Sequence, residues 1–243
     1  MRIGGALAVL LTLGMGEPGA SATPAVTMAW SGLQKLAPRE VEAGPLLGMA
    51  ASRLMASSDY RALVRPTEAE SEGHAAPSWG AILTARWSYG LTLTLAPRRE
   101  TYGIKTREET VSFPDNPFPH TLRADTRLSY NVYPLLAGWE WQRARHGFRA
   151  QAGGYYAFRE GESIRWIVDG ETYPNLPGHR VASTVTGWMV ATEYAIRLGP
   201  GTLLAGLEAQ RGAESLIKGL RGTLRSEAAQ ARLAYVWTLY RRP

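Results

Sequence analysis

The sequence contains no cysteine, and this absence excludes several kinds of protein at once. A chain without thiols has no disulfide framework, no thiolate metal site and no lipid-modified N-terminal cysteine. Long apolar runs are missing as well, because none reaches the roughly 20 residues that a membrane-spanning helix needs. A chain of 243 residues without such a helix is either a water-soluble protein or a barrel that crosses a membrane with strands.

Phenylalanine is scarce, whereas aromatic residues that carry a polar atom are plentiful. The chain has 4 Phe against 8 Trp and 11 Tyr, and Trp and Tyr concentrate at membrane–water boundaries. The formal net charge is +6, but the arginines are scattered along the chain instead of forming one basic patch. This scatter argues against a nucleic-acid partner.

The first 22 residues have the features of a secretory signal peptide. Arg2 supplies the positive start, residues 3–15 the apolar centre, and Ala20-Ser21-Ala22 a cleavage site. A membrane anchor is the alternative interpretation of this segment, although its apolar centre is short for a spanning helix. Residues 23–44 show no clean periodicity and are predicted to be a periplasmic lead-in.

From residue 45 to 240 the chain alternates between apolar and polar residues with the period of two that is typical of strands. The clearest case has Phe148, Ala150, Ala152, Gly154, Tyr156 and Phe158 on one face, opposite Arg149, Gln151, Gly153, Tyr155, Ala157 and Arg159. The pattern predicts strands at about 45–57, 78–88, 91–105, 120–142, 148–160, 181–197, 202–212 and 226–240.

The connections between these strands alternate between short and long. Short turns are expected at 89–90, 143–147 and 198–201, and long loops at 58–77, 106–119, 161–180 and 213–225. Bacterial outer-membrane barrels have this arrangement, with short periplasmic turns and longer outer loops. The prediction is therefore an all-β fold, an eight-stranded antiparallel up-and-down transmembrane β-barrel. Asp169-Gly170 is a strong hairpin signal. It predicts that the strands at 148–160 and 181–197 extend beyond the membrane as a ribbon that carries Trp166.

One face of each strand is predicted to contact lipid and the other to line the interior. Trp79 and Trp87 would lie roughly 20 Å apart along the membrane normal, one at each border of the apolar band. The expected interface aromatics are Trp79, Trp87, Trp139, Trp141, Tyr156, Tyr235 and Trp237. The expected interior polar network is Arg86, Arg98, Glu100, Arg123, Asp125, Arg127, Arg149, Arg159, Glu193, Glu208 and Arg232. The apolar phase of strand 120–142 changes after Tyr133, which predicts a β-bulge near Pro134.

Two short segments resemble a known family. Tyr130-Asn131-Val132-Tyr133-Pro134-Leu135-Leu136 and Ala152-Gly153-Gly154-Tyr155-Tyr156, together with the order of strands, are similar to the small outer-membrane β-barrel domain family (porin-like, PorT-like) of Gram-negative bacteria. The resemblance implies a monomer without known catalysis. Members usually end on an aromatic residue that the barrel assembly machinery reads. This chain departs from that pattern by ending in Arg241-Arg242-Pro243, and the preceding Tyr240 is expected on the inward phase.

These observations predict a non-enzymatic, integral outer-membrane protein, exported through the periplasm, whose outer loops have a structural or binding role. A narrow pore that repels cations, given the arginine excess, a lipid-modifying enzyme and a soluble lipocalin-like barrel remain alternatives. Among possible catalytic pairs, only His179 with Ser183 merits a test. No metal or cofactor motif is present, and the partners expected are outer-membrane lipid, lipopolysaccharide and the barrel assembly machinery. The possible lipopolysaccharide contacts are Arg211, Lys218, Arg221 and Arg225.

Overall fold

A single antiparallel sheet that closes on itself accounts for almost all of the described chain. The computed structural model describes residues 37–56, 71–106, 109–113, 116–174, 181–216 and 224–242. The strands are β1 (Glu40–Ala56), β2 (Ser71–Arg86), β3 (Leu91–Leu95), β4 (Arg98–Thr106), β5 (Glu109–Phe113), β6 (Asn116–Arg143), β7 (His146–Val168), β8 (Glu171–Pro174), β9 (Thr184–Leu198), β10 (Gly201–Gly212) and β11 (Leu224–Arg241). Among the described residues there is no helix long and apolar enough to cross a membrane.

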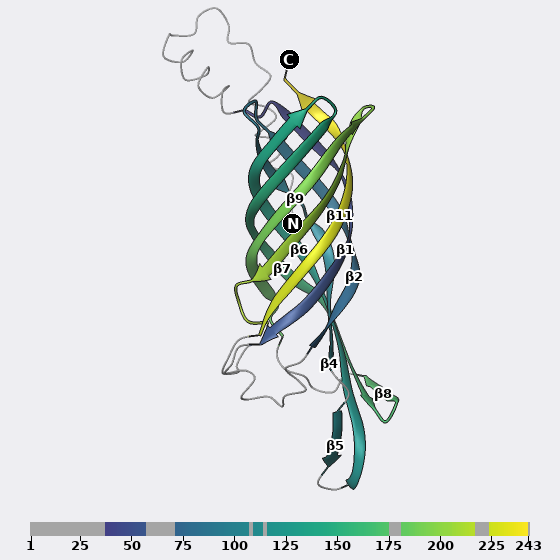
Figure 1. Ribbon diagram of the computed structural model, residues 1–243. Helices are drawn as coiled ribbons and strands as arrows, with labels where there is room; N and C mark the ends of the chain where they lie inside the picture. Colours follow the sequence, from purple (N-terminus) through teal and green to yellow (C-terminus); the bar gives the residue numbers. More distant parts are fainter. Residues whose placement is uncertain are drawn as a thin grey trace, which may run out of the picture. The chain divides into compact units, whose positions relative to one another are not determined.

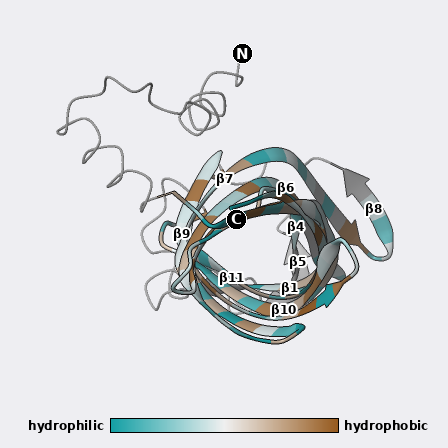
Figure 2. Cartoon of the chain, turned by 90° about the horizontal axis from the view of Figure 1, so that it is seen from above, coloured by the Kyte–Doolittle hydropathy of each residue, from teal (hydrophilic) through white to brown (hydrophobic). Residues whose placement is uncertain are grey.

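The wall of the barrel consists of eight strand positions, as predicted. β1 pairs with β2, which pairs with both β3 and β4, and these two short strands share one position against β6. The ring continues through β7, β9, β10 and β11, and β11 pairs with β1. Figure 1 shows the inclined strands from the side, and Figure 2 looks along the barrel at the closed ring. The sheet therefore has no open edge between its first and last strands.

The two ends of the barrel differ. The tight turns at 87–90, 144–145 and 199–200 lie at the same end as the start of β1 and the end of β11 (Figure 1). We call this the turn end. At the opposite end, which we call the ribbon end, β6 and β7 continue beyond the wall, with β5 beside β6 and β8 beside β7. We call this extension the outer ribbon.

The predicted hairpin at Asp169-Gly170 is confirmed. Val168 pairs with Glu171, and both turn residues have positive φ, 50° for Asp169 and 85° for Gly170, which is the geometry of a type I′ turn. The ribbon differs from the prediction in its composition, because it contains β5, β6, β7 and β8 and leaves out β9. The side chain of Trp166 lies outside the described part of the structure.

The predicted bulge near Pro134 is wrong. Pro134 pairs regularly with Tyr155, and the register shift lies between Ser129 and Tyr130, where Glu160 is the extra residue of β7. Leu128, Tyr130, Val132 and Leu136 are all buried in the interior, in one unbroken phase. The inward face of β6 is itself apolar, so hydrophobicity alone assigns these residues to the wrong side.

The seam between β1 and β11 contains a second bulge. Glu42 pairs with Thr238 but Val41 pairs with Tyr240, so that Leu239 is an extra residue. The bulge reverses the facing of the last residues: Tyr240 lies on the outward side with Val41, contrary to the expected inward phase, and Arg241 faces Glu40. Arg241 donates from Nε to Glu40 Oε1 at 2.9 Å.

Replacing Arg241 with alanine is expected to weaken this seam modestly. Because the Arg241 side chain is 53% exposed, its ion pair is worth at most about 1 kcal/mol. Urea unfolding of the refolded barrel in detergent, followed by Trp fluorescence, measures the change. An unchanged unfolding midpoint would show that the pair with Glu40 contributes nothing to closure.

Candidate functional site

The interior of the barrel near the turn end is filled by two arginines and the glutamates around them. Arg86 donates from Nη1 to Glu40 at 3.0 Å and from Nη2 to Glu42 at 2.9 Å, and its Nε lies 3.1 Å from Glu140. Arg149, which is fully buried, donates from Nη2 to Glu140 at 2.9 Å and from Nη1 to Glu193 at 3.2 Å. Glu140 therefore joins the two arginines into one network.

The network continues towards the middle of the barrel. Arg232 Nη2 lies 3.0 Å from Glu193 Oε1, and Arg232 Nη1 also donates to Glu208. Arg98 donates from Nη1 to Glu208 at 3.2 Å and from Nε to Glu100. The chain of ion pairs thus runs without interruption from Glu40 at the turn end to Glu100.

Buried ions are tolerated only when they are paired and hydrogen-bonded, and the sign balance of this network is informative. Among the described residues six glutamates and four arginines are buried, which leaves an excess of two negative charges. Arg197 and Arg241 at the turn end approach Glu40 from the rim and bring two positive charges. The predicted arginine excess of the interior is therefore wrong, because several predicted arginines lie elsewhere and three glutamates were not foreseen.

The structure brings together only part of the predicted polar network. Seven of its members are buried and paired in the interior: Arg86, Arg98, Glu100, Arg149, Glu193, Glu208 and Arg232. Arg127 is exposed and faces outward, Arg123 lies in the outer ribbon opposite Ile167, and Arg159 forms a partly exposed ion pair with Glu162. These three were assigned through the wrong phase of β6 or lie beyond the closed part of the wall. The side chain of Asp125 lies outside the described part of the structure.

Sequence reasoning missed Glu40, Glu42 and Glu140. β1 begins at Glu40, five residues before the predicted start. The prediction began too late because Gly44-Pro45 interrupts the alternation and resembles the end of a connection. The signal that could have located it is the alternation of Glu40 and Glu42 with Val41 and Ala43. Glu140 lies between the outward residues Trp139 and Trp141, so the alternation in this half of β6 already indicates an inward position for it.

The ribbon end of the interior is apolar. Tyr102, Tyr130 and Tyr155 pack there with Leu128, Val185 and other buried side chains, and Tyr102 donates to Glu100 at 2.7 Å, which joins this cluster to the charged network. Ala182 and Leu216 close the cluster from the connections, with Tyr130 donating to Ala182 O at 3.1 Å. The cavity between the tyrosines and Leu216 is about 10 Å³, room for one water molecule.

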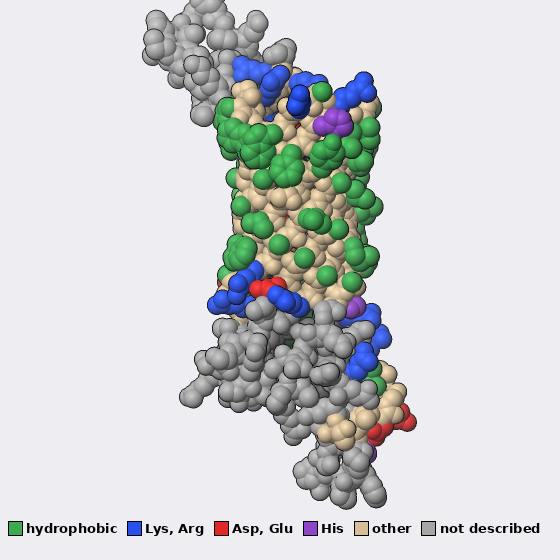
Figure 3. All heavy atoms as spheres, viewed as in Figure 1, with side chains coloured by type: hydrophobic (Ala, Val, Ile, Leu, Met, Phe, Trp, Pro, Cys, Tyr) green, Lys and Arg blue, Asp and Glu red, His purple; other side chains and the backbone are tan. Residues whose placement is uncertain are grey.

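The outside of the barrel has the opposite character. Every predicted lipid-facing residue of β7, β10 and β11 lies on the outer surface, including Phe148, Leu207 and Leu233, which are 47%, 66% and 55% exposed. Figure 3 shows hydrophobic side chains over the wall between bands of Lys and Arg near its two ends. Of the predicted interface aromatics, Trp79, Trp139, Trp141, Tyr156 and Trp237 are exposed, and Trp87 and Tyr235 are half-buried.

Aromatic rings on the outer wall also contact one another. Near the turn end Tyr89 lies 6.1 Å from Trp139, and Tyr235 lies 5.1 Å from Trp237 between ring centroids. Near the ribbon end Tyr133 and Phe158 are 5.0 Å apart. A closed sheet with an apolar outer wall, aromatic rings towards both ends and a charged interior is the arrangement of a membrane-spanning β-barrel. The fold and its surface define that class of protein.

Comparison with known proteins adds the following. No family model matches the sequence, and no curated protein matches it. The fold is similar to Ail, the attachment invasion locus protein of Yersinia pestis, with 8% identity and a TM-score of 0.38 over 82% of this chain and 99% of that one. It is also similar to Neisserial surface protein A, with 12% identity and a TM-score of 0.37 over 80% and 95%. For OprG of Pseudomonas aeruginosa the identity is 8% and the TM-score 0.48 over 85% and 98%.

Of the remaining candidate sites, the predicted lipopolysaccharide contacts Lys218 and Arg221 lie outside the described residues. His179 lies outside the described residues, so its pair with Ser183 is not tested. His146 stacks on Tyr194 at the turn end. Among the described residues no group of His, Asp and Glu has the arrangement of a metal site.

In the outer ribbon, the His120 Nδ1 atom forms a hydrogen bond with Asp169 Oδ2. This contact was not predicted from the sequence. Asp169 Oδ1 also accepts a hydrogen bond from the backbone N–H of Thr121 at 2.7 Å. The bond with His120 and the bond from Thr121 lower the pKa of the Asp169 carboxyl below its usual 3.8. These contacts hold the turn of the β7–β8 hairpin against β6.

The Asp169 carboxyl is accordingly expected to titrate below pH 3.8. A carboxyl whose pKa is lowered by folding stabilises the hairpin above its unfolded pKa, and the effect is lost as the pH falls through the lower, folded value. The carboxyl ¹³C shift of Asp169, measured by NMR in micelles, gives the midpoint. The His120→Ala variant is expected to move the midpoint upward, and an unmoved midpoint would remove His120 as the cause.

Proposed function

We propose that the protein is an integral β-barrel of the Gram-negative outer membrane, exported through the periplasm. The observation that carries the proposal is the inverted polarity of the barrel, with leucines and aromatic rings outside and paired charges inside. Both ends of the barrel's chain lie with the tight turns, which in outer-membrane barrels is the periplasmic side. The outer ribbon would then project from the cell.

The proposed role is structural or binding, without catalysis, and acts through the outer ribbon and the outer loops. Support comes from the length of β6 and β7, 28 and 23 residues, which exceeds the 9–11 or so that a spanning strand needs. Polar side chains on an extended ribbon are suited to contact with a partner outside the membrane. The proposal includes a monomer, inserted by the barrel assembly machinery, whose outer loops contact lipopolysaccharide.

The test combines location with orientation. Cell fractionation and heat-modifiable migration on gels are expected to place a folded barrel in the outer membrane. A short epitope inserted after Gly170, in the hairpin of the outer ribbon, is expected to be labelled on intact cells. An epitope inserted after Ala144, in a tight turn, is expected to be labelled only after the cells are opened. Soluble protein, or the reverse labelling pattern, would overturn the proposal.

A pore is the weaker candidate, because the interior is occupied by the charged network and the tyrosine cluster. Folded protein is expected to give no steady conductance in planar bilayers. Steady channels from wild-type protein would favour the pore. Lipase and acyltransferase assays with wild type and His179→Ala address the enzymatic alternative.

A further inference from the structure

An ionic cluster lies on the outer wall of the barrel, on three neighbouring strands at the ribbon end. We define the wall cluster as Arg53 of β1, Glu227 and Arg225 of β11, and Arg211 of β10. Glu227 is directly opposite Arg53 on one side and Arg211 on the other. Arg53 donates to Glu227 Oε2 from Nη2 at 2.8 Å and from Nε at 3.1 Å, and Arg211 Nε lies 3.4 Å from Glu227 Oε1.

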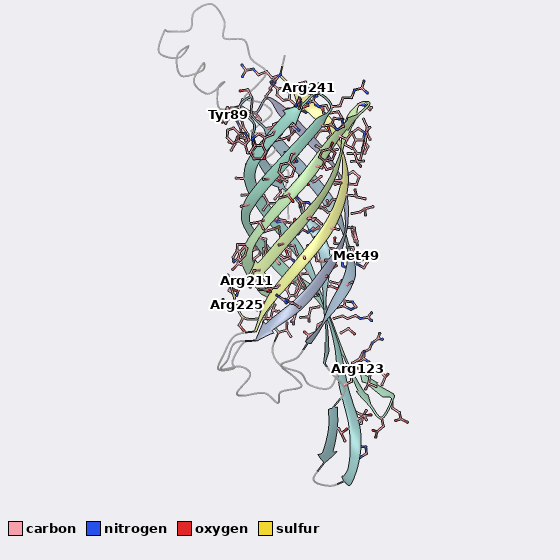
Figure 4. The ribbon with its side chains drawn as sticks, viewed as in Figure 1. Met49, Tyr89, Arg123, Arg211, Arg225 and Arg241 are labelled. Carbon is pink, nitrogen blue, oxygen red and sulfur yellow. The ribbon has the colours of Figure 1, made fainter. Side chains whose placement is uncertain are left out.

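The wall cluster continues the rows of residues that face lipid. Arg211 follows Leu207 and Ala209 at intervals of two, and Glu227 precedes Ala229 on the same outward face. Successive positions on one face are about 6.6 Å apart along a strand. The arginines therefore begin one position beyond the apolar wall, at the level where a bilayer places its headgroups. Figure 4 shows Arg211 and Arg225 near each other at this border.

Positive charge exceeds negative charge in the wall cluster. The cluster has three guanidinium groups and the single carboxylate of Glu227, which contacts Arg53 and Arg211. Glu214, the next acidic residue along the chain from β10, accepts a hydrogen bond from Thr186 of β9 at 2.9 Å. The Nε of Arg225 is buried and has no hydrogen-bond acceptor among the described residues. A buried donor without an acceptor costs free energy, and an acceptor supplied from outside the chain would remove that cost.

The wall on β4 and β7 provides a contrast. There Arg99 and Glu160 form a pair at 2.9 Å with similar exposure of both side chains, 42% and 45%. One arginine and one glutamate neutralise each other and leave no charge for a ligand. In the wall cluster, by contrast, three arginines accompany a single glutamate.

We propose that the wall cluster binds the phosphate of a glycolipid in the outer leaflet, which rests on the outer-membrane location proposed above. Arginine matches phosphate in geometry and in charge, through paired N–H donors. Glu227 holds Arg53 and Arg211 at the spacing of adjacent strands, and Arg225 contributes from the next outward position of β11. The acyl chains of the same lipid would lie along Leu207, Ala209 and Ala229.

The experiment uses the full-length protein, folded in detergent, with lipid A as the probe and native mass spectrometry or a thermal-shift titration as the readout. The variant Arg53→Gln/Arg211→Gln/Arg225→Gln is expected to bind bisphosphorylated lipid A at least about tenfold more weakly than wild type, because several charge-assisted hydrogen bonds are lost. Arg99→Gln is the matched control and is expected to bind as wild type does.

A comparison of three lipids identifies the chemical group that the wall cluster recognises. Dephosphorylated lipid A is expected to bind wild type and triple variant equally, and phosphatidylglycerol to bind wild type more weakly than lipid A. Equal binding of lipid A by the triple variant and wild type, or an equal loss in Arg99→Gln, would overturn the site. If the triple variant inserts into the membrane and migrates as a folded barrel but binds lipid A as wild type does, the wall-cluster proposal fails while the outer-membrane proposal stands.

Discussion

The Arg149→Ala variant is expected to lose about 3–5 kcal/mol of unfolding free energy, the largest effect of any single substitution proposed for this chain. Arg149 is fully buried and contacts Glu140 and Glu193, with Glu42 3.7 Å from its Nη2. Without the Arg149 guanidinium, the buried carboxylates of Glu140 and Glu193 lose a positive partner, and an unpaired buried charge is strongly destabilising. Urea unfolding of the barrel in lipid vesicles, followed by Trp fluorescence, gives the free energy, and heat-modifiable migration reports whether the barrel closes at all.

A second substitution separates the charge effect from loss of packing. Adding Glu140→Gln to Arg149→Ala removes one of the stranded charges and is expected to restore part of the stability. Arg143→Ala changes an exposed arginine next to a tight turn and is expected to remain within about 0.5 kcal/mol of wild type. If Arg149→Ala behaved like Arg143→Ala, the interior would be hydrated and the ion network would not hold the barrel together.

The Leu233→Arg variant is expected to destabilise the barrel in a bilayer by about 2–4 kcal/mol. Leu233 is the middle one of five outward positions between Ala229 and Trp237, it is 55% exposed, and it lies beside Leu47 and Ala205 of the neighbouring strands. An arginine here would be placed near the centre of the hydrocarbon. Unfolding in vesicles of defined thickness measures the cost.

The same substitution distinguishes a membrane barrel from a soluble one. On the surface of a soluble protein, exchange of an exposed leucine for arginine changes stability by no more than about 0.5 kcal/mol. Leu239→Arg, at the turn end, is the matched control and is expected to cost about 0–1 kcal/mol, because the interface is close. Equal losses of stability for Leu233→Arg and Leu239→Arg would contradict the interpretation that hydrocarbon surrounds the middle of the wall.

The sequence predicts the wall where the two faces differ in polarity. In β7 the alternation of Phe148 to Phe158 with Arg149 to Arg159 places every residue from 148 to 158 on its correct side, because each inward position near the turn end is polar or small. In the ribbon-end half of β6 the polarity of the two faces is inverted. The buried inward residues are Leu128, Tyr130 and Val132, and the outward residues are Arg127, Ser129 and Asn131. Alternation alone therefore assigns this half to the wrong side, and the bulge that sets the register lies in the partner strand, at Glu160.

The interior network could be predicted in part. Arg149, Glu193 and Arg232 follow from alternation, but the pairs they form depend on register between strands that are distant in sequence. Arg98 and Glu208, which are 110 residues apart, meet across the lumen, and no local pattern specifies that contact. The partnership of His120 with Asp169 has the same cause, because it depends on how far β6 and β7 continue together.

The continuity of β6 and β7 from the wall into the outer ribbon has a mechanical consequence. Their ladder runs from the pair Arg143 and His146 to the pair Leu122 and Val168, with a single shift of register. A load applied at the tip of the ribbon therefore acts along the strands and is shared as shear by many hydrogen bonds at once. Tension on the ribbon is therefore transmitted directly to the strands of the barrel wall, because no flexible segment separates the two parts of β6 and β7.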